Sequence, residues 1–249
     1  MALDYVVDLP CRPKQTLGTE KILELLILRG AAMFTLDDHQ RNGGRPWRRL
    51  TFSNVVTRPT GAVKVRSSVT KALERAAQLD AFVDDCLACP ANNDGQSGFG
   101  CYGRVNYPLD LAAEEMLLSM LPDDLTAAGA GTEFKAGWDH FGWDGSQAAE
   151  VRAASRTFFE SPVAPVRQWP TGEILTGDQV FEMLFIGQGF DWSYAKLLAI
   201  SFRLIILDEE AGPLLDLAIP ESEQASKVIA YLNSISFAAL NGLPVLLDG

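Results

Sequence analysis

The first clear structural pattern lies in residues 3–30, which have the sequence LDYVVDLPCRPKQTLGTEKILELLILRG. Residues 3–9 are β-branched and aromatic at their centre and stop at Pro10, as is typical of a short strand. Residues 19–29 are apolar on most sides of a helix, and Gly30 is the expected end of that helix. Because a helix that is apolar on most sides is buried, a strand and a core helix begin the fold.

The remainder of the chain extends this beginning to a mostly helical α+β fold. Two further strands are expected at residues 49–57 and 62–66, joined by a turn into a hairpin. Helical patterns then recur along the rest of the chain, at residues 67–84, 111–121, 147–159, 178–186, 192–207 and 221–240. Thr176 and Gln179 have the spacing of a capping box at the start of one of these helices. We therefore expect a small N-terminal sheet followed by a helical C-terminal half.

The sequence contains fewer signals for domain boundaries than for individual helices and strands. A chain of 249 residues can form one large domain or two small ones. No internal repeat and no low-complexity linker divides the sequence. We therefore expect residues 1–249 to form a single domain. The alternative is a cysteine-containing α+β unit over residues 1–105, followed by a helical unit over residues 106–249.

The charge of the chain limits its partners. The sequence has 21 Lys and Arg against 32 Asp and Glu, a formal net charge of −11. Because Lys and Arg drive phosphate binding by displacing counterions, this charge argues against nucleic acid as a partner. The local exception is a basic and aromatic segment that contains Arg41, Arg45, Trp47, Arg48 and Arg49. Its composition suits single-stranded nucleic acid or a phosphate ligand. Its Gly and Pro residues favour a solvated turn before a strand, which is our interpretation.

The compartment is predicted from what the sequence does not contain. The N-terminus has neither the basic start nor the sustained apolar stretch of a signal peptide. The most apolar run, residues 197–207, is interrupted by Ser201 and Arg203 and is shorter than the roughly 20 residues that cross a membrane. We expect a cytoplasmic protein without a membrane span. In a reducing compartment, cysteines are more often thiols or metal ligands than disulfides.

Four cysteines are the most distinctive chemical feature of the sequence. Cys86 and Cys89 are two residues apart, the half-site spacing of tetrahedral metal sites and of redox disulfides. Cys101 follows a flexible Gly- and Asn-rich loop, and Cys11 follows the first predicted strand. Together the four thiolates would complete a closed metal shell. We predict a metal site at Cys11, Cys86, Cys89 and Cys101, with structural zinc as the metal.

Other interpretations of the same cysteines stay open. An iron–sulfur cluster accepts irregular ligand spacing, and Pro90 after Cys89 matches the proline that follows a ligand in bacterial ferredoxins. A reversible disulfide between Cys86 and Cys89 is a further alternative, although the expected place of Cys86 at a helix C-terminus does not lower its pKa. Unconnected, buried thiols are the simplest interpretation. With zinc, the chain would be a binding or regulatory module whose helical C-terminal half accepts a protein partner.

One further cluster could take part in catalysis. Residues 138–145 have the sequence WDHFGWDG, in which His140 lies between Asp139 and Asp144. A histidine beside a carboxylate is a candidate general base. No nucleophile elbow completes such a site, and no glycine-rich stretch matches a nucleotide-binding fingerprint. We interpret this segment as a surface loop anchored by aromatic packing, so the sequence identifies no reaction.

Overall fold

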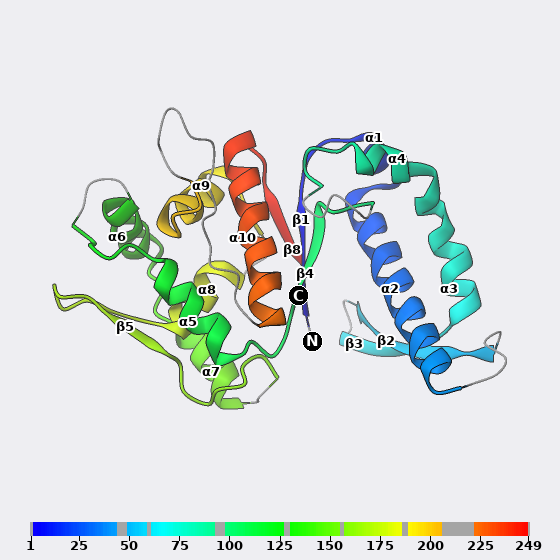
Figure 1. The fold of residues 1–249 in the computed structure, drawn as a ribbon, viewed down its shortest axis with the longest axis horizontal. Coiled ribbons are helices and arrows are strands. Elements are labelled where there is room, and N and C mark those ends of the chain that lie inside the picture. The colour runs from blue at the N-terminus through cyan, green and yellow to red at the C-terminus, as the bar shows by residue number, and fades with distance from the viewer. Residues whose placement is uncertain are drawn as a thin grey trace. The chain divides into compact units, whose positions relative to one another are not determined.

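The computed structural model describes residues 2–43, 49–58, 61–92, 98–126, 130–154, 157–185, 189–205 and 222–248. The chain divides into two compact units. Figure 1 colours the residues by number, from blue at the N-terminus to red at the C-terminus. Met1–Leu9 and Gly100–Gly249 form one unit, called the sheet unit here, and Pro10–Phe99 form the other, called the hairpin unit. The predicted fold class, a mostly helical α+β protein with a small sheet, is confirmed. The single-domain prediction stays a prediction, because compact packing does not show whether a unit folds alone.

The sheet unit contains a four-stranded antiparallel sheet in the order β4-β1-β8-β7. Its strands are β1 (Ala2–Val7), β4 (Tyr102–Asn106), β7 (Gly189–Phe190) and β8 (Val245–Asp248). Tyr5 on the central strand β1 lies opposite Gly103 on β4 and Leu247 on β8. A Cβ atom at Gly103 would lie 2.1 Å from the Tyr5 side chain, so the close approach of these strands requires glycine.

The helices of the sheet unit are α5 (Leu111–Met120), α6 (Ala130–Phe141), α7 (Ser146–Ala154), α8 (Gly177–Phe185), α9 (Trp192–Ser201) and α10 (Glu223–Asn241). A short hairpin, β5 (Val166–Gln168) and β6 (Ile174–Thr176), accompanies them. Helix α10 packs against β1 and β4 and buries Tyr231. The centroid of the Tyr231 ring lies 4.9 Å from that of Tyr5 and 5.2 Å from that of Phe185. These ring contacts join the sheet to the helices around one core.

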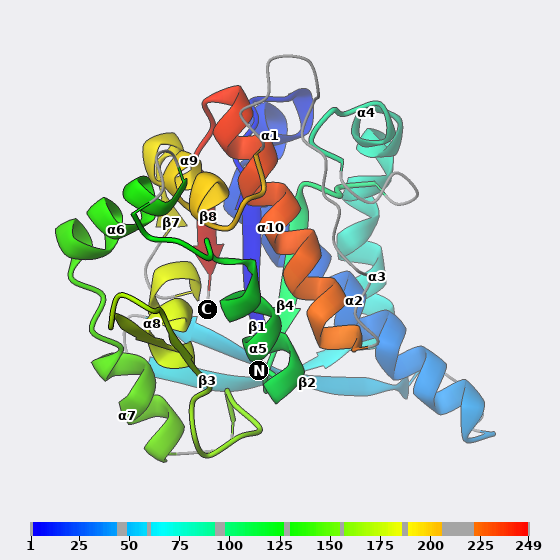
Figure 2. The ribbon, with the colours of Figure 1, turned by 60° about the vertical axis from the view of Figure 1, so that its left-hand side comes forward.

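The hairpin unit contains α1 (Arg12–Leu17), α2 (Thr19–Arg41), β2 (Thr51–Arg58), β3 (Gly61–Ser68), α3 (Val69–Ala76), a 3₁₀ helix (Ala77–Phe82) and α4 (Val83–Leu87). Helices α2 and α3 lie side by side, with the β2–β3 hairpin across the same end of both (Figures 1 and 2). A small core of Ala32, Val69 and Ala72 lies between them, and Phe52 of β2 packs against it. The hairpin is thus supported from one side by two helices.

Two predicted helix boundaries in this unit were wrong. Helix α2 does not end at Gly30 but continues to Arg41. The packing of Ala32 against α3 outweighs the cost of about 1 kcal/mol for a helical glycine. The helix predicted at residues 67–84 is interrupted after Ala76. Arg29 of α2 donates to the Ala76 carbonyl at 2.7 Å, so a partner from another helix caps α3.

Elsewhere the local predictions were mostly confirmed. The capping box exists, since the Thr176 N–H donates to Gln179 Oε1 at 2.9 Å and the Gln179 N–H donates to Thr176 Oγ1 at 3.3 Å. The helices expected at residues 147–159 and 192–207 are shorter, ending as α7 at Ala154 and as α9 at Ser201. The strands β5 to β8 were missed because each is four residues or fewer. The turn predicted between β2 and β3 lies outside the described residues.

Candidate functional site

The four cysteines do not form the predicted site. Cys86 is buried in α4, Cys89 follows that helix, Cys11 precedes α1, and Cys101 precedes β4. None of the four forms a disulfide bond, and within the described ranges no group of three or more His, Cys, Asp or Glu side chains is placed to hold a metal ion. The prediction of a four-cysteine metal protein was therefore wrong, and zinc and an iron–sulfur cluster lose the ligand set on which both were based.

The surroundings of Cys86 explain this outcome. Burial raises the pKa of the Cys86 thiol, and a hydrogen bond with the Phe99 backbone only partly opposes that shift. A thiol with a raised pKa stays protonated at neutral pH, whereas disulfide exchange needs the thiolate. The two-residue spacing of Cys86 and Cys89 arises here from a helix end, where the Cys89 N–H donates to the Cys86 carbonyl. The predicted disulfide switch therefore has no support in this geometry.

The predicted general base is not brought together with its carboxylates. Asp139 lies on α6, which replaces the expected surface loop, and it pairs with Lys135 at 2.7 Å. Asp144 accepts a hydrogen bond from the Ser146 N–H at 2.8 Å, and its hydrogen bonds with Ser146 lower its pKa. His140 is exposed and forms no hydrogen bond with either carboxylate in the part of the chain described. A catalytic role for these residues stays a prediction.

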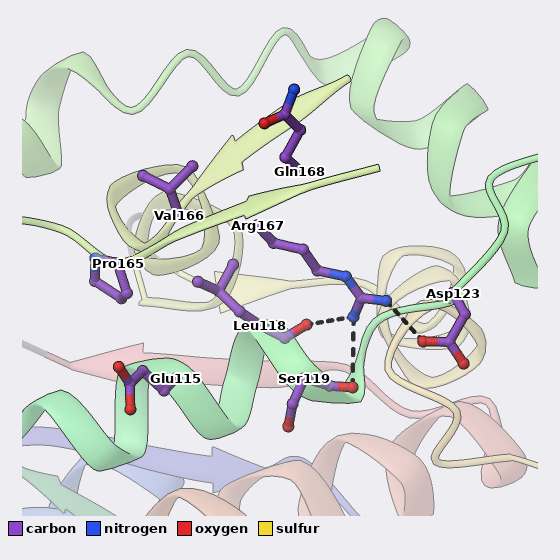
Figure 3. A pocket seen from close by; sticks show the side chains of 8 residues that line it. All are labelled: Glu115, Leu118, Ser119, Asp123, Pro165, Val166, Arg167 and Gln168. Carbon is purple, nitrogen blue, oxygen red and sulfur yellow. Dashed lines mark hydrogen bonds and ion pairs between the residues drawn. The ribbon is translucent and has the colours of Figure 1, made fainter. Parts of the chain in front are cut away.

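A shallow pocket of about 590 Å³ lies between α5 and β5 (Figure 3). Its lining residues are Glu115, Leu118, Ser119, Asp123, Pro165, Val166, Arg167 and Gln168. Arg167 donates to the carbonyls of Leu118 at 2.6 Å and Leu121 at 2.8 Å, at the end of α5. It also pairs with Asp123, whose pKa is lowered by Arg203 and Arg167. Because the guanidinium group of Arg167 caps the end of α5, no positively charged side chain that lines the pocket is left to bind a ligand anion.

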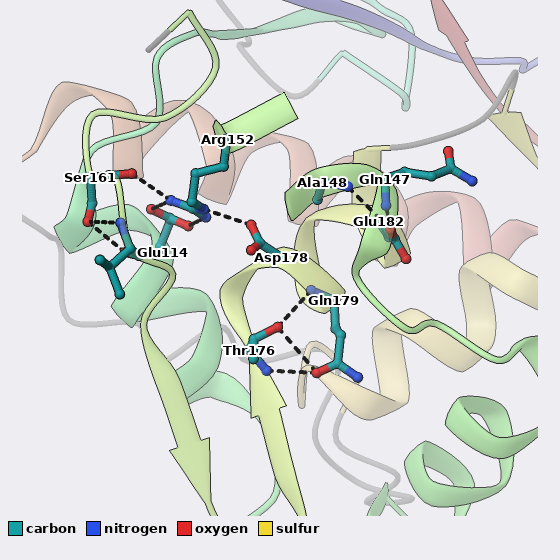
Figure 4. Close-up of polar contacts among 10 residues, drawn as sticks. Glu114, Gln147, Ala148, Arg152, Ser161, Thr176, Asp178, Gln179 and Glu182 are labelled. Atoms are coloured by element: carbon teal, nitrogen blue, oxygen red, sulfur yellow. Dashed lines mark hydrogen bonds and ion pairs between the residues drawn. The ribbon is translucent and has the colours of Figure 1, made fainter. Parts of the chain in front are cut away.

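A buried ionic cluster joins three helices of the sheet unit (Figure 4). Arg152 of α7 donates to Asp178 of α8 at 2.8 Å and to both carboxylate oxygens of Glu114 of α5. It also donates to the Ser161 carbonyl at 2.9 Å and lies over the Phe159 ring, 3.7 Å from its centroid. Burial raises the pKa of Glu114, and Arg152 opposes that shift. Because these groups are enclosed and satisfied by one another, the cluster stabilises the fold rather than presenting a site.

The charge of the chain is divided unequally between the two units. The hairpin unit has 13 Lys and Arg against nine Asp and Glu, a formal charge of +4. The sheet unit has eight against 23, a formal charge of −15. Within the hairpin unit, residues 41–75 contain nine Lys and Arg and a single acid, Glu74. The positive charge therefore collects around the β2–β3 hairpin, although the chain as a whole is acidic.

The two faces of this hairpin differ in chemistry. Thr51 and Ser53 of β2, and Lys64 and Arg66 of β3, are exposed. The alternate residues Phe52, Val65 and Ser67 are partly buried. This alternation over residues 51–53 and 64–67 follows from the pleat, which turns successive side chains to opposite faces of the strands. One face therefore packs on α2 and α3 through Phe52, and the other, called the outer face here, presents only polar and basic side chains among those described.

The exposed cations at the hairpin differ in ion pairing from those earlier in the hairpin unit. In the preceding part of the hairpin unit, Arg12, Lys21 and Arg29 each pair with a carboxylate. The exposed cations that form no ion pair with any described residue are Arg41, Arg49, Lys64, Arg66 and Lys71. We call these five residues the basic hairpin surface. Arg41 ends α2, Arg49 precedes β2 and Lys71 lies in the first turn of α3, so all five adjoin or belong to the hairpin.

Arg66 is held in place on the outer face. Its Nε atom donates to Thr51 Oγ1 of the neighbouring strand at 2.8 Å. This bond is diagonal in the ladder, because Arg66 lies opposite Ser53. No other hydrogen bond of its guanidinium group is formed with the described residues, so its terminal nitrogens face solvent with their donors available.

Sequence reasoning found only one end of this surface. The basic segment at residues 41–49 was recognised, but its members Arg45, Trp47 and Arg48 lie outside the described residues. The residues that it missed are Lys64, Arg66 and Lys71, and a count of charge in each segment would have found them. No protein-family model, curated protein or solved structure matches this chain, so its site is interpreted from its own geometry.

Proposed function

We propose that this protein binds nucleic acid through the basic hairpin surface. The observation that carries the proposal is the set of five exposed cations that no described carboxylate neutralises. Such cations replace the counterions that surround a phosphate backbone, and the release of those counterions drives binding. An ion-paired arginine would first have to give up its carboxylate. The basic hairpin surface therefore has the electrostatic character that phosphate binding requires.

The net charge of −11 led us to expect that nucleic acid is not a partner, and the proposal departs from that expectation. The expectation used the charge of the whole chain, which sums two units of opposite sign. At physiological ionic strength, electrostatic interactions between exposed charges are screened over about 8 Å. A phosphate at the hairpin therefore responds chiefly to the cations beside it.

A cytoplasmic location belongs to the same proposal. In the described part of the chain, no helix is both long and apolar enough to cross a membrane. We propose a cytoplasmic location, where nucleic acid is present and where cysteines are more often thiols than disulfides. A protein partner, expected from the sequence for the helical C-terminal half, is the alternative. An acidic protein could occupy the same cations, and the experiment below separates the two.

The test is the salt dependence of binding to a labelled 20-nucleotide DNA, measured by fluorescence polarisation with single-stranded and duplex probes. If each of the five cations neutralises one phosphate of a duplex, the logarithm of the affinity falls with the logarithm of salt with a slope of about −4.5. Between 50 and 200 mM salt, the affinity should then fall about 500-fold. The double variant Lys64→Ala/Lys71→Ala should have a slope of about −2.7 and a loss of about 40-fold over the same range.

A matched control is Lys196→Ala. Lys196 is an exposed lysine of α9 in the sheet unit and, like Lys64, pairs with no described carboxylate. Its loss removes one positive charge, as each of the two hairpin substitutions does, and should leave the affinity and the slope unchanged. Absence of binding to every nucleic acid at 50 mM salt would refute the proposal and favour an acidic protein partner. An equal loss in Lys196→Ala and in the hairpin variant would refute the assignment of the surface.

A further inference from the structure

We infer that the ligand of this surface is double-stranded DNA and that the β2–β3 hairpin enters its major groove, an inference that rests on the proposed function. The hairpin has the shape for this. Its strands have eight residues each and, among the residues described, each is hydrogen-bonded to no other strand. A ribbon of two strands about 4.8 Å apart and roughly 27 Å long fits a groove about 12 Å wide.

The outer face carries side chains that can contact base edges. Arg66 can donate two hydrogen bonds to the O6 and N7 atoms of guanine, and Lys64 can donate to the same acceptors. Thr51 and Ser53 carry hydroxyl groups that pair with more than one base. The hydrogen bond from Arg66 Nε to Thr51 uses only one of the guanidinium nitrogens, so the two terminal nitrogens keep their donors for a base. An arginine held in this way loses little conformational freedom when it binds.

The flanking cations complete a groove-binding arrangement. The Val69 N–H donates to the Leu50 carbonyl at 3.0 Å, which fixes the start of α3 beside the start of β2. Arg49 and Lys71 therefore lie at the base of the ribbon, one on each chain segment that enters or leaves it. Contacts to the phosphates that border a groove fix the register of a protein on a duplex, while contacts inside it select sequence. The arrangement supplies both kinds of group.

The same face disfavours the other nucleic acids. Single-stranded DNA and RNA are bound by aromatic side chains on which bases stack. The described outer-face side chains are Thr51, Ser53, Lys64 and Arg66, none of them aromatic, and Phe52 is turned to the core. Double-stranded RNA has a deep and narrow major groove that side chains do not enter. Among the described side chains, the outer face thus offers hydrogen-bond donors for base edges and no aromatic ring for stacking, which favours a B-form DNA duplex.

The experiment compares four labelled probes at one salt concentration: a 20-base-pair DNA pool of random sequence, its single strands, an RNA duplex, and a DNA duplex that carries glucosylated 5-hydroxymethylcytosine. The glucose fills the major groove and leaves the phosphates unchanged. The plain DNA duplex should bind about tenfold more tightly than each of the other three. A small molecule that binds the minor groove should not displace the protein from the plain DNA duplex.

Two results would overturn the inference and leave the proposed function standing. The first is equal or tighter binding of single strands or RNA. The second is equal binding of the glucosylated and plain duplexes, which would place the contacts on phosphates alone. Failure of all four probes to bind would overturn the proposed function itself. The variant Thr51→Val gives a second readout, because it keeps every charge and removes the hydrogen bond that holds Arg66. The ratio of the affinities for the plain and the glucosylated duplex should become smaller. The slope of the logarithm of affinity against the logarithm of salt should stay unchanged.

Discussion

Replacement of Arg152 by methionine should destabilise the sheet unit more than any single change at an exposed ion pair. The cation is enclosed with Glu114 and Asp178, with side-chain exposures of 4%, 2% and 11%. Arg152→Met leaves two buried carboxylates without a counter-charge, and breaking a buried pair in this way costs about 3–5 kcal/mol. For a chain of this size, that free energy lowers the melting temperature by about 6–20 °C.

The assay is urea unfolding followed by tryptophan fluorescence. Four of the five tryptophans, Trp138, Trp143, Trp169 and Trp192, belong to the sheet unit, so the signal reports mainly on that unit. The control is Arg104→Met, in the same unit. Arg104 pairs with Asp4 at 2.7 Å but is 46% exposed, and exposed pairs contribute about 0–1 kcal/mol. A loss for Arg152→Met no larger than that of the control would refute the argument.

The pH dependence of this loss gives an independent check. Burial raises the pKa of Glu114 above its ordinary value of 4.5 in the folded state. A raised folded pKa means that the group's contribution to stability is present at low pH and is lost as the pH rises through the folded value. Without Arg152, which opposes the shift, the folded pKa should rise further. The difference in stability between Arg152→Met and wild type should therefore shrink as the pH falls from neutrality towards 4.5, and a constant difference would contradict this explanation.

Two further predictions concern the helices and the thiols. Glu182 of α8 accepts hydrogen bonds from the N–H groups of Gln147 and Ala148 at the start of α7 (Figure 4), and also from that of Gly145. Glu182→Ala should therefore cost about 1 kcal/mol in the same unfolding assay. No change would show that water replaces the carboxylate there. With a thiol reagent, all four cysteines should react in urea, whereas in the native protein the partly exposed Cys11 and Cys89 should react well before Cys86 and Cys101, which are buried. Fewer than four reactive thiols in urea would contradict their assignment as free.

The local elements were predictable because their causes are local. The strand β1 follows from β-branched residues before Pro10, and the hairpin follows from two such runs around a turn. The capping box at Thr176 and Gln179 depends on two side chains three residues apart, so spacing alone identified it. The end of α3 at Ala76 was not predictable in this way, since Arg29 comes from a helix 47 residues earlier in the chain.

The candidate site, too, was predictable from the sequence only where its features have local causes. Alternating apolar and polar residues in β2 and β3 predict which hairpin side chains face outward, and the charge of residues 41–75 is plain in the sequence. That Arg49, Lys64 and Lys71 lack a carboxylate partner among the described residues depends on where the acids lie after folding. The cysteines illustrate the opposite error, because suitable spacing at Cys86 and Cys89 did not bring a set of ligands together.

The sequence by itself determined the fold class, the elements that depend on neighbouring residues, and the total charge of each segment. Only the tertiary structure decided which distant side chains meet: Arg152 with Glu114 and Asp178, and Arg66 with Thr51 across the ribbon. The physical reason is that periodicity and capping act over a few residues, whereas a salt bridge or a metal shell needs atoms within a few ångströms of one another. That proximity is set by how helices and strands pack, and packing depends on the whole chain at once.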